Sequence, residues 1–505
     1  MKTIYTRLTR TLLALTLLAA QAGCLLGPDF VPPAAPPVRQ YTREPASMPG
    51  MADQDQDQDQ EQEQEQPQLL LIGADPPAQW WRLFGSPALN AAVDRALTQN
   101  PTLQAAVSNL RAAQDNLRAG NGLFYPQLDA AMKLERNRSA PALQGSSAPA
   151  SVFNVATLEG SISYALDLFG GRRRTVEQLG ALVDVQQQLR DAAYLTLTAN
   201  VVNTCIARAG YMSQIRLTEQ IIALEQQQLL VIQARVKAGI APFADQLAQA
   251  SLLAGNQALL VQLKQRLSQA EHLLAQLQGD FPADVVVPAV ELDDLHLPAA
   301  IPVSLPSSLV RRRPDILAAE ARLHAASAAI GISSAAQYPS LDLTASYGLA
   351  ARGLSPLAGA SAPFWSIGPS LSAPLFHGGG LQAQRDAAVN AFEASQAQYR
   401  QTVLAVFAQV ADALRALQAD GRVLEAQSEA ERDARDTLAL QQASYSAGLA
   451  SYVDLLTFDM QYHNAAIARL QTLTLRYQDT VSLLAASGGG WDGAPSGERR
   501  DPAGR

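Results

Sequence analysis

Hydrophobic and polar residues alternate strictly in four stretches of the chain. In the first stretch, apolar Leu128, Ala130 and Met132 interleave with Asp129 and Lys133. A period of two residues is typical of a β-strand with one apolar and one polar face. The pattern therefore predicts four strands, which span residues 127–137, 153–168, 340–350 and 364–376.

After each pair of strands the hydrophobic period changes to that of an α-helix. From Arg172 to Ala238 the sequence has no proline, is rich in Ala, Leu, Gln and Arg, and places apolar residues at three- and four-residue steps. Residues 381–447 repeat this composition. At a rise of about 1.5 Å per residue, each run would form a helix roughly 100 Å long.

A glycine follows each long run, at Gly239 and at Gly448, and a shorter helical run then continues to a further glycine. Glycine adopts positive φ at a helix end without steric cost, so the chain can reverse there. A long helix that reverses at a glycine predicts an antiparallel coiled-coil hairpin. The predicted hairpins span residues 172–279 and 381–487.

The same order of elements occurs twice along the chain. Pro101 and Pro314 each open a helical stretch, and a Tyr-Pro pair closes each stretch before the strands begin. The sequence LFGG from Leu168 corresponds in the same way to LFHG from Leu375. The two copies stay offset by about 207 to 213 residues, which indicates an internal tandem repeat.

The four strands have the length and alternation of transmembrane β-strands. Four strands are too few to close a barrel, and an open sheet in lipid would leave unpaired backbone groups at both edges, at several kcal/mol each. The strands must therefore be shared between chains. Three chains would supply twelve strands and two chains would supply eight, and the composition does not choose between them.

The first residues indicate secretion. Lys2, Arg7 and Arg10 precede a short apolar run, which is about half the ~20 residues that a spanning helix needs. Ala22 and Gly23 then precede Cys24. This ending resembles the lipobox of bacterial lipoproteins, which implies cleavage before Cys24, a covalent lipid on that residue and sorting to the outer membrane.

Gln21 departs from the lipobox, which prefers Leu at that position. The alternative is an ordinary signal peptide that leaves Cys24 as a free thiol. After the signal, no apolar stretch is long enough to predict a membrane-spanning helix.

The formal net charge of −8 comes largely from one low-complexity tract, residues 53–66, in which seven acidic residues alternate with Gln. The rest of the mature chain is nearly neutral, and nothing predicts nucleic-acid binding. Cys205, in a predicted helix, is expected to be a small packing residue.

No catalytic or metal-binding set is apparent, so neither an enzyme nor a resident metal or cofactor other than lipid is predicted. The HGGG sequence at His377 ends a predicted strand and is interpreted as a turn. The five histidines lack metal-ligand spacing: His272, His296, His324, His377 and His463.

Seven motifs resemble those of TolC/OprM-type outer membrane factors, and among these the NodT-like lipoproteins of tripartite efflux systems are most similar. The resemblance covers about Cys24 to Trp491. The motifs are GCLLGPDFVPP, WWRLFGSPALNAAV, YALDLFGGRRR, RRRPDILAAEARL, APLFHGGG, YSAGLASYVDLL and GGGW.

The resemblance implies an α+β membrane protein. It implies a trimeric twelve-stranded β-barrel, with four strands per chain, continuous with a long antiparallel α-helical barrel. An equatorial belt around Asp280 to Ser308 is implied as well. The expected domains are a signal peptide at 1–23, a lipidated linker with the acidic Gln tract at 24–78, repeat 1 at 79–281, an inter-repeat linker at 282–306, repeat 2 at 307–491 and a flexible tail at 492–505.

The function implied is a passive exit duct for drugs or other small molecules. The implied partners are two further copies of the chain in a homotrimer, a periplasmic adaptor, an inner-membrane transporter and outer-membrane lipid. One alternative is a duct for type I protein secretion or nodulation-factor export. A more remote alternative is a periplasmic coiled-coil scaffold that conducts nothing.

In similar proteins the hairpin tips close the channel. Asp454 matches one family position for a ring of aspartates, and Asp245 is its counterpart in the first repeat. Thr457 stands where the family often has a second aspartate. Tyr445 is a candidate for a hydrogen bond between hairpins. The alternatives are first-turn residues for both aspartates and a packing residue for Tyr445.

Other conspicuous side chains receive structural interpretations. The arginines at 311–313 are expected to cap a helix or to form salt bridges between subunits, and those at 172–174 to be solvated. The Trp80-Trp81 pair is expected to pack on the belt. Trp365 is expected in an aromatic girdle or in a core.

Overall fold

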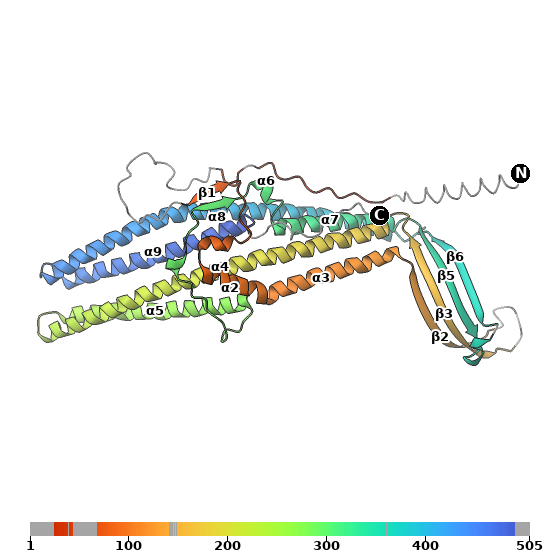
Figure 1. The fold of residues 1–505 in the computed structure, drawn as a ribbon, viewed down its shortest axis with the longest axis horizontal. Helices are drawn as coiled ribbons and strands as arrows, with labels where there is room; N and C mark the ends of the chain where they lie inside the picture. Colours follow the sequence, from red (N-terminus) through yellow and green to blue (C-terminus); the bar gives the residue numbers. More distant parts are fainter. Residues whose placement is uncertain are drawn as a thin grey trace. The chain divides into compact units, whose positions relative to one another are not determined.

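A computed structural model describes residues 25–38, 40–43, 68–140, 145, 147, 149–359 and 361–489. Within these residues the chain is mostly helical, with six strands (Figure 1). The predicted signal peptide, the predicted lipid attachment at Cys24, the acidic Gln tract and the tail at 492–505 lie outside the described residues.

The described chain forms two compact units, and each unit combines segments from both sequence copies. The first unit includes Leu110–Gln186 and Ala319–Tyr399, and the second includes Gln187–Ala318 and the chain from Arg400 onward. The units therefore do not coincide with the two predicted repeats. The reason is that strands of one copy pair with strands of the other, and helices of both copies pack together.

The first unit holds an antiparallel four-stranded sheet in the order β2-β3-β5-β6 (Figure 1). Two strands end earlier than predicted. β3 ends because Asp167 accepts hydrogen bonds from the backbone N–H groups of Arg172 and Arg173 and so starts the next helix. β6 ends before Pro374, which has no N–H to donate to a ladder. The bounds are β2 Gln127–Arg138, β3 Val152–Leu166, β5 Ser340–Ala351 and β6 Pro363–Ser372.

Four long helices form the two hairpins, and each begins and ends within a few residues of its predicted bound. The longer helix of each hairpin has 67 residues. In Figure 1, α4 runs beside α5, and α8 runs beside α9. The bounds are α4 Gly171–Lys237, α5 Phe243–Gln278, α8 Gly380–Ser446 and α9 Tyr452–Ala486.

Both hairpins reverse through the same hydrogen-bonded turn. Gly448, with φ of 76°, donates to the carbonyl of Tyr445, and the next residue, Leu449, donates to that of Ser444. Gly239, with φ of 74°, makes the equivalent turn in the first hairpin. This pair of bonds is a Schellman motif, which satisfies carbonyls that the helix end leaves free.

Alanine substitutions at two glycines are expected to differ in cost. At Gly448 a Cβ would meet open space, so only the positive φ opposes Gly448→Ala, at about 1 kcal/mol of unfolding free energy. At Gly279, also at positive φ, a Cβ would lie 2.6 Å from the carbonyl oxygen of Gln99, so Gly279→Ala is expected to cost at least about 2 kcal/mol. Chemical unfolding of both variants checks this; equal costs would contradict it.

Shorter elements complete the second unit and flank the sheet. The segment 282–306, the expected inter-repeat linker, contributes β4, which pairs in parallel with β1. The sequence pattern does not predict this pair, because its two strands are short and far apart in the chain. The bounds are β1 Leu69–Ile72, η1 Trp80–Phe84, α2 Pro87–Gln99, α3 Pro101–Asn121, η2 Gly122–Phe124, η4 Leu292–Asp294, β4 Ala300–Val303, α6 Pro306–Leu309, α7 Pro314–Ala335 and η5 Ser355–Ala358.

Aromatic side chains form a core in the second unit. Trp80 and Phe84 are fully buried, and Trp81 is 1% exposed. Trp80 contacts Trp81 edge-on, with 6.0 Å between ring centroids, and Phe84 lies 6.1 Å from Tyr477 of α9. The WWRLF segment therefore packs the N-terminal part of the chain against the long helices, and it contacts the predicted belt where the backbone N–H of His296 donates to the carbonyl of Phe84.

Among the described residues, α8 contains one stretch that is long and apolar enough to cross a membrane by composition alone. The sequence predicts no such helix. The stretch is apolar because α8 is rich in alanine, which is also common in helices that pack inside a protein.

Candidate channel wall and hairpin tips

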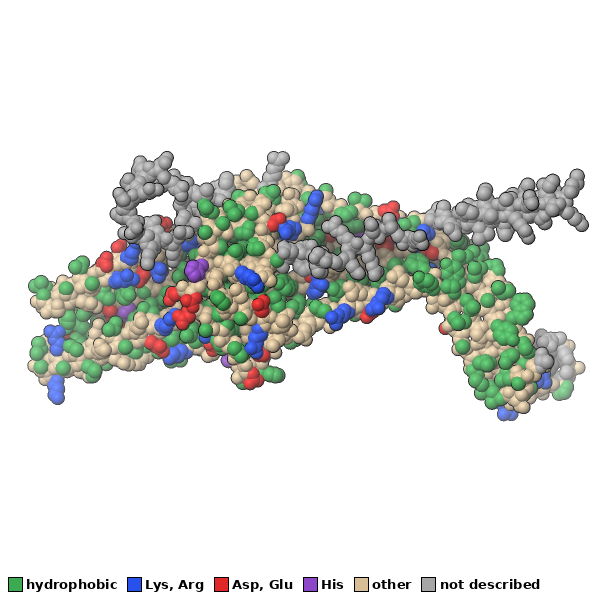
Figure 2. All heavy atoms as spheres, viewed as in Figure 1, with side chains coloured by type: hydrophobic (Ala, Val, Ile, Leu, Met, Phe, Trp, Pro, Cys, Tyr) green, Lys and Arg blue, Asp and Glu red, His purple; other side chains and the backbone are tan. Residues whose placement is uncertain are grey.

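The two faces of the four-stranded sheet differ in polarity, row by row. On one face, Leu128, Ile162, Ala345 and Ile367 pair in a row across all four strands. The adjacent row, on the other face, consists of Asp129, Ser161, Ser346 and Ser366. Figure 2 shows hydrophobic side chains gathered on the sheet. The sheet thus has a face suited to lipid and a face suited to water.

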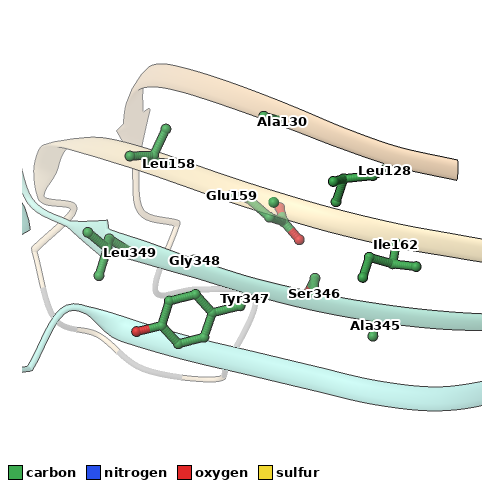
Figure 3. Close-up of a pocket in the computed structure, with 11 residues that line it drawn as sticks. Leu128, Ala130, Leu158, Glu159, Ile162, Ala345, Ser346, Tyr347, Gly348 and Leu349 are labelled. Carbon is green, nitrogen blue, oxygen red and sulfur yellow. The ribbon is translucent and has the colours of Figure 1, made fainter.

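A shallow apolar hollow lies on this sheet (Figure 3). It forms where Gly160, which has no side chain, pairs with Ala130 on one side and Tyr347 on the other. Leu128 and Ile162 also line it. The hollow presents no set of convergent polar groups, so it resembles a surface for an acyl chain more than a catalytic pocket.

Within the described chain, β2 and β6 each pair with another strand on one side only. Large apolar side chains on these edge strands are exposed, including Met132 on β2 and Trp365 and Ile367 on β6. Unpaired, apolar edges of this length invite further strands. A single copy of the chain therefore leaves its sheet incomplete.

The segment that follows residue 24 is held at the end of the sheet, where α4 begins. Leu25 packs directly on Gly170. A Cβ atom at position 170 would lie only 2.4 Å from Cδ1 of Leu25, so the leucine fits only because this residue is glycine. The backbone N–H of Leu26 donates to the carbonyl of Phe169. Phe30 stacks on His324 of α7, with 4.5 Å between ring centroids.

Arg174 fixes this segment. Its guanidinium donates to the carbonyls of Leu26 and Gly27 and pairs with Asp29 at 2.8 Å and with Glu177 at 2.7 Å. The side chain is 2% exposed. The expectation that the arginines at 172–174 are solvated is therefore wrong for Arg174, because its partners come from a distant N-terminal segment that a local pattern does not reveal.

At the tip of the second hairpin, Asp454 belongs to a capping box. Its carboxylate accepts from the backbone N–H of Ser451 at 3.2 Å, and the Ser451 hydroxyl accepts from the N–H of Asp454 at 3.1 Å. Asp454 is exposed. Asp245 is half-buried in the first turn of α5. Both aspartates are thus first-turn residues in one chain.

Tyr445 lies between the two hairpins. Arg235, near the end of α4, donates a hydrogen bond to the Tyr445 hydroxyl, and its guanidinium lies 5.1 Å from the ring centroid. The Tyr445 ring also lies 5.5 Å from that of Tyr452. The predicted hydrogen bond between hairpins is therefore present within one chain.

Beneath the tips, apolar side chains from both hairpins share one core. Ile232 of the first hairpin packs with Leu438, Leu455 and Leu456 of the second. Tyr452 donates from its hydroxyl to Gln249 at 2.5 Å, and Gln249 donates to the carbonyl of Glu225. The tips of the two hairpins are thus joined by packing and by buried hydrogen bonds.

Arg313 is the buried member of the arginine cluster at 311–313. It donates to the carbonyl of Ala486 at the end of α9 and to both carboxylate oxygens of Asp315. Arg312 forms an ion pair with Asp75. The cluster therefore caps a helix and makes ion pairs within one chain, which is one of the two roles expected for it.

The structure brings together three buried side chains that the sequence analysis did not group. Glu225 of α4 lies beside Asp459 and His463 of α9. Burial raises the pKa of Glu225 to about 7 and that of Asp459 to about 6, and it lowers the pKa of His463 to about 4. The four-residue spacing of Asp459 and His463 indicates that these two side chains lie on one helix face. The sequence does not show that Glu225 joins them, because it lies in the other hairpin.

A second pair of acids predicts a dependence of stability on pH. Burial, with the hydrogen bond and charge of Asp479, raises the pKa of Asp420 to about 7. An unfolded Asp has a pKa of about 3.9, so stability is expected to fall as pH rises from about 4 to about 7 and to stay low above that.

Asp420→Asn removes this effect. At pH 8 the variant is expected to be more stable than the wild type by about 1–2 kcal/mol, because Asp420 is only partly buried, and at pH 4 the two should match. Thermal unfolding at both pH values measures the difference. A variant that is destabilised equally at both would contradict the assignment.

The profile of the family described as "Outer membrane efflux protein" matches residues 92–280 and 305–489. The pyoverdine export outer membrane protein OpmQ of Pseudomonas putida is 30% identical over 82% of this chain and 89% of its own length. The probable efflux pump outer membrane protein TtgC of Pseudomonas putida is 28% identical over 96% of each chain. The open-state MtrE outer membrane channel of Neisseria gonorrhoeae is similar in structure, with a TM-score of 0.78 and 26% identity over 92% of this chain and 98% of that chain.

Proposed function

This chain belongs to the outer membrane efflux protein family and is an outer-membrane efflux channel, and we propose that three copies form one passive, lipid-anchored duct. The observation that carries the proposal is the open four-stranded sheet, apolar on one face and unpaired along β2 and β6 in the described chain. Three copies would give twelve strands, a closed wall in which every strand has two neighbours. Transport, not catalysis, is the role of such a wall.

The internal repeat supports a specific contact between neighbouring subunits. Within one chain, β3 of the first copy pairs with β5 of the second copy, for example Ser163 with Thr344. The counterparts of these residues in the repeat are Ser370 of β6 and Ala131 of β2. We therefore expect Ser370 to lie opposite Ala131 of the neighbouring subunit. After the repeat offset is applied, the register of the β5–β6 pair differs by two residues from that of the β2–β3 pair. The repeat therefore predicts the register between subunits to within two residues.

One aromatic pair, together with the exposure of its counterparts in the repeat, supports the same arrangement. Phe169, at the end of the first copy's strands, packs on Tyr338 of the second copy, with 4.8 Å between ring centroids. Their counterparts, Phe376 and Tyr125, are 87% and 68% exposed in one chain. If three copies close a ring, Phe376 packs on Tyr125 of the next subunit and both become buried.

A lipid on Cys24 would anchor each subunit at the outer membrane. Support comes from Leu25, the next residue, which packs on Gly170 just after β3. The end of the apolar sheet face is where the interface of a membrane would lie. A lipid attached at this point would therefore lie beside the strands.

The hairpin tips are the proposed gate and docking site. In a trimer, three copies of Asp454 would form an acidic ring that favours cations, with Asp245 nearby and Gly239 and Gly448 forming the turns. Thr457 in place of a second aspartate makes the ring less acidic. A periplasmic adaptor and an inner-membrane transporter would bind these tips, and the transporter would supply the energy.

The proposed cargo is small molecules, such as drugs. The relatives named for efflux pumps and for pyoverdine export support this class over secreted proteins. A deletion strain that becomes sensitive to toxic small molecules would support the proposal. A deletion that abolishes secretion of one protein, with no change in sensitivity, would favour the type I secretion alternative.

Conductance in a planar lipid bilayer tests the duct itself. The purified full-length protein is expected to give discrete conductance steps with a preference for cations. Asp454→Asn should reduce this preference, whereas Asp293→Asn, at an exposed position in the η4 turn, should leave it unchanged. If neither the wild type nor the tip variants conduct after insertion into the bilayer, the alternative of a non-conducting coiled-coil scaffold is favoured.

A further inference from the structure

A buried polar cluster lies between the two hairpins, below the Tyr452–Gln249 pair. Glu225 is fully buried on α4, and Asp459 and His463 are 5% and 6% exposed on α9. One potential ligand atom from each side chain lies within 4.8 Å of the other two. Asp459 and His463 are four residues apart, so both project from the same face of their helix.

Two buried polar atoms of the cluster have no hydrogen-bond partner. Glu225 accepts from the side-chain amide of Asn256 with Oε1, at 2.7 Å, but its Oε2 has no partner. Nδ1 of His463 has none either, and its Nε2 is 3.6 Å from Oδ1 of Asp459, too far for a hydrogen bond. Buried polar atoms without partners are rare in folded proteins and call for an explanation, of which a bound ion is one.

The donor set matches a transition metal. We propose that Glu225, Asp459 and His463 bind one divalent cation of the Zn²⁺ type. Imidazole nitrogen together with carboxylate oxygen suits Zn²⁺ and Co²⁺, whereas Mg²⁺ and Ca²⁺ prefer oxygen alone. Two carboxylates around one site also carry negative charge that burial disfavours unless a cation is present.

The geometry requires only small side-chain movements. In a tetrahedral site, donors about 2.0–2.2 Å from a Zn²⁺ ion lie roughly 3.4 Å from one another. The three potential ligand atoms here lie within 4.8 Å of one another, so movements of about 1 Å would bring them to that spacing. Asn256 already holds Glu225 by one carboxylate oxygen and leaves the other free for a metal. Asn256 is therefore a positioning residue, of the kind that orients metal ligands in known sites.

The metal would link the two hairpins of one chain. Glu225 and its positioning residue belong to the first hairpin, and Asp459 and His463 belong to the second. The site lies next to the buried Tyr452–Gln249 pair, since Gln249 donates to the carbonyl of Glu225. A bound cation would thus add a coordinate link between helices that packing already joins at the tips. This inference does not depend on the channel role.

Titration with Co²⁺ tests the proposal on the full-length protein in detergent, after treatment with a chelator. The wild type is expected to bind one Co²⁺ per chain, with visible absorption bands of a protein-bound ion, and Zn²⁺ should abolish these bands by displacement. Glu225→Gln and His463→Gln should each weaken binding at least tenfold. Asn256→Leu should weaken it about tenfold, the usual effect of removing a residue that orients a ligand.

Two matched variants serve as controls. His272→Gln, at an exposed histidine on α5, and Asp293→Asn, at an exposed acid in η4, should bind Co²⁺ as the wild type does. The proposal is overturned if the wild type shows no saturable Co²⁺ or Zn²⁺ binding. It is also overturned if folded Glu225→Gln and His463→Gln variants bind with unchanged affinity. If the variants do not fold, saturable Co²⁺ binding by the wild type supports the metal site and its absence overturns it. Conductance tests the channel role separately, because the metal site does not depend on it.

Discussion

Replacing Trp80 with alanine is expected to lower the free energy of unfolding by about 3–5 kcal/mol. Trp80 has no exposed surface, and its ring contacts those of Trp81 and Phe84 edge-on. Its indole N–H makes no hydrogen bond, so the loss comes from packing alone. Removing the ring would leave a large cavity where the N-terminal part of the chain meets the long helices, and the surroundings can fill it only partly.

Chemical unfolding in mild detergent, followed by circular dichroism, measures this change. Phe281→Ala provides the control, because Phe281 is an aromatic residue that is 78% exposed. Its substitution is expected to change stability by less than about 0.5 kcal/mol. If both variants lower the free energy of unfolding by similar amounts, the aromatic core around Trp80 does not stabilise the protein as expected.

Substitution of Arg174 is expected to detach the N-terminal segment. Arg174→Met removes two hydrogen bonds to backbone carbonyls and two ion pairs, and the expected cost is about 2–4 kcal/mol. This free-energy cost is smaller than that of breaking a fully buried ion pair, because Asp29 is 85% exposed and remains solvated when the arginine is removed. The loss should be local to residues 25–33 and the start of α4.

Hydrogen exchange of the segment 25–33 measures this release directly, and unfolding gives its cost. Arg173→Met is the matched control, since Arg173 is a 41% exposed neighbour with the same charge. Exchange should accelerate in Arg174→Met and stay slow in Arg173→Met. If both variants exchange alike, Arg174 does not hold the segment, and the support for anchoring beside the strands is lost.

The regular elements of the fold were predictable because their hydrophobic periods are long and uninterrupted. β2 begins at the predicted residue, and α4 begins one residue before Arg172, since both depend on local patterns of period two and period 3.6. The glycine turns were predictable for a similar reason, because Gly239 and Gly448 each follow a long run without proline and adopt positive φ.

Contacts between distant segments were not predictable from such patterns. The burial of Arg174 depends on residues 26–29, and the Glu225 cluster depends on a helix from the other hairpin. The pairing of β1 with β4 likewise joins two short segments. Periodicity reports which face of an element is apolar, but it does not report which distant polar group meets a charged side chain in the folded chain.

Cysteine cross-linking between β6 and β2 tests most directly whether three copies complete one sheet. The protein carrying both Ser370→Cys and Ala131→Cys is oxidised in native membranes. Covalent species of two and three chains are predicted, with three as the limit, and each single variant should give none. Lys133→Cys and Asp129→Cys, each combined with Ser370→Cys, cover the two registers that lie two residues away. Met132→Cys combined with Ser370→Cys is the negative control, because Met132 lies on the opposite face. A limit at two chains, or no cross-link in any same-face pair, would contradict the account.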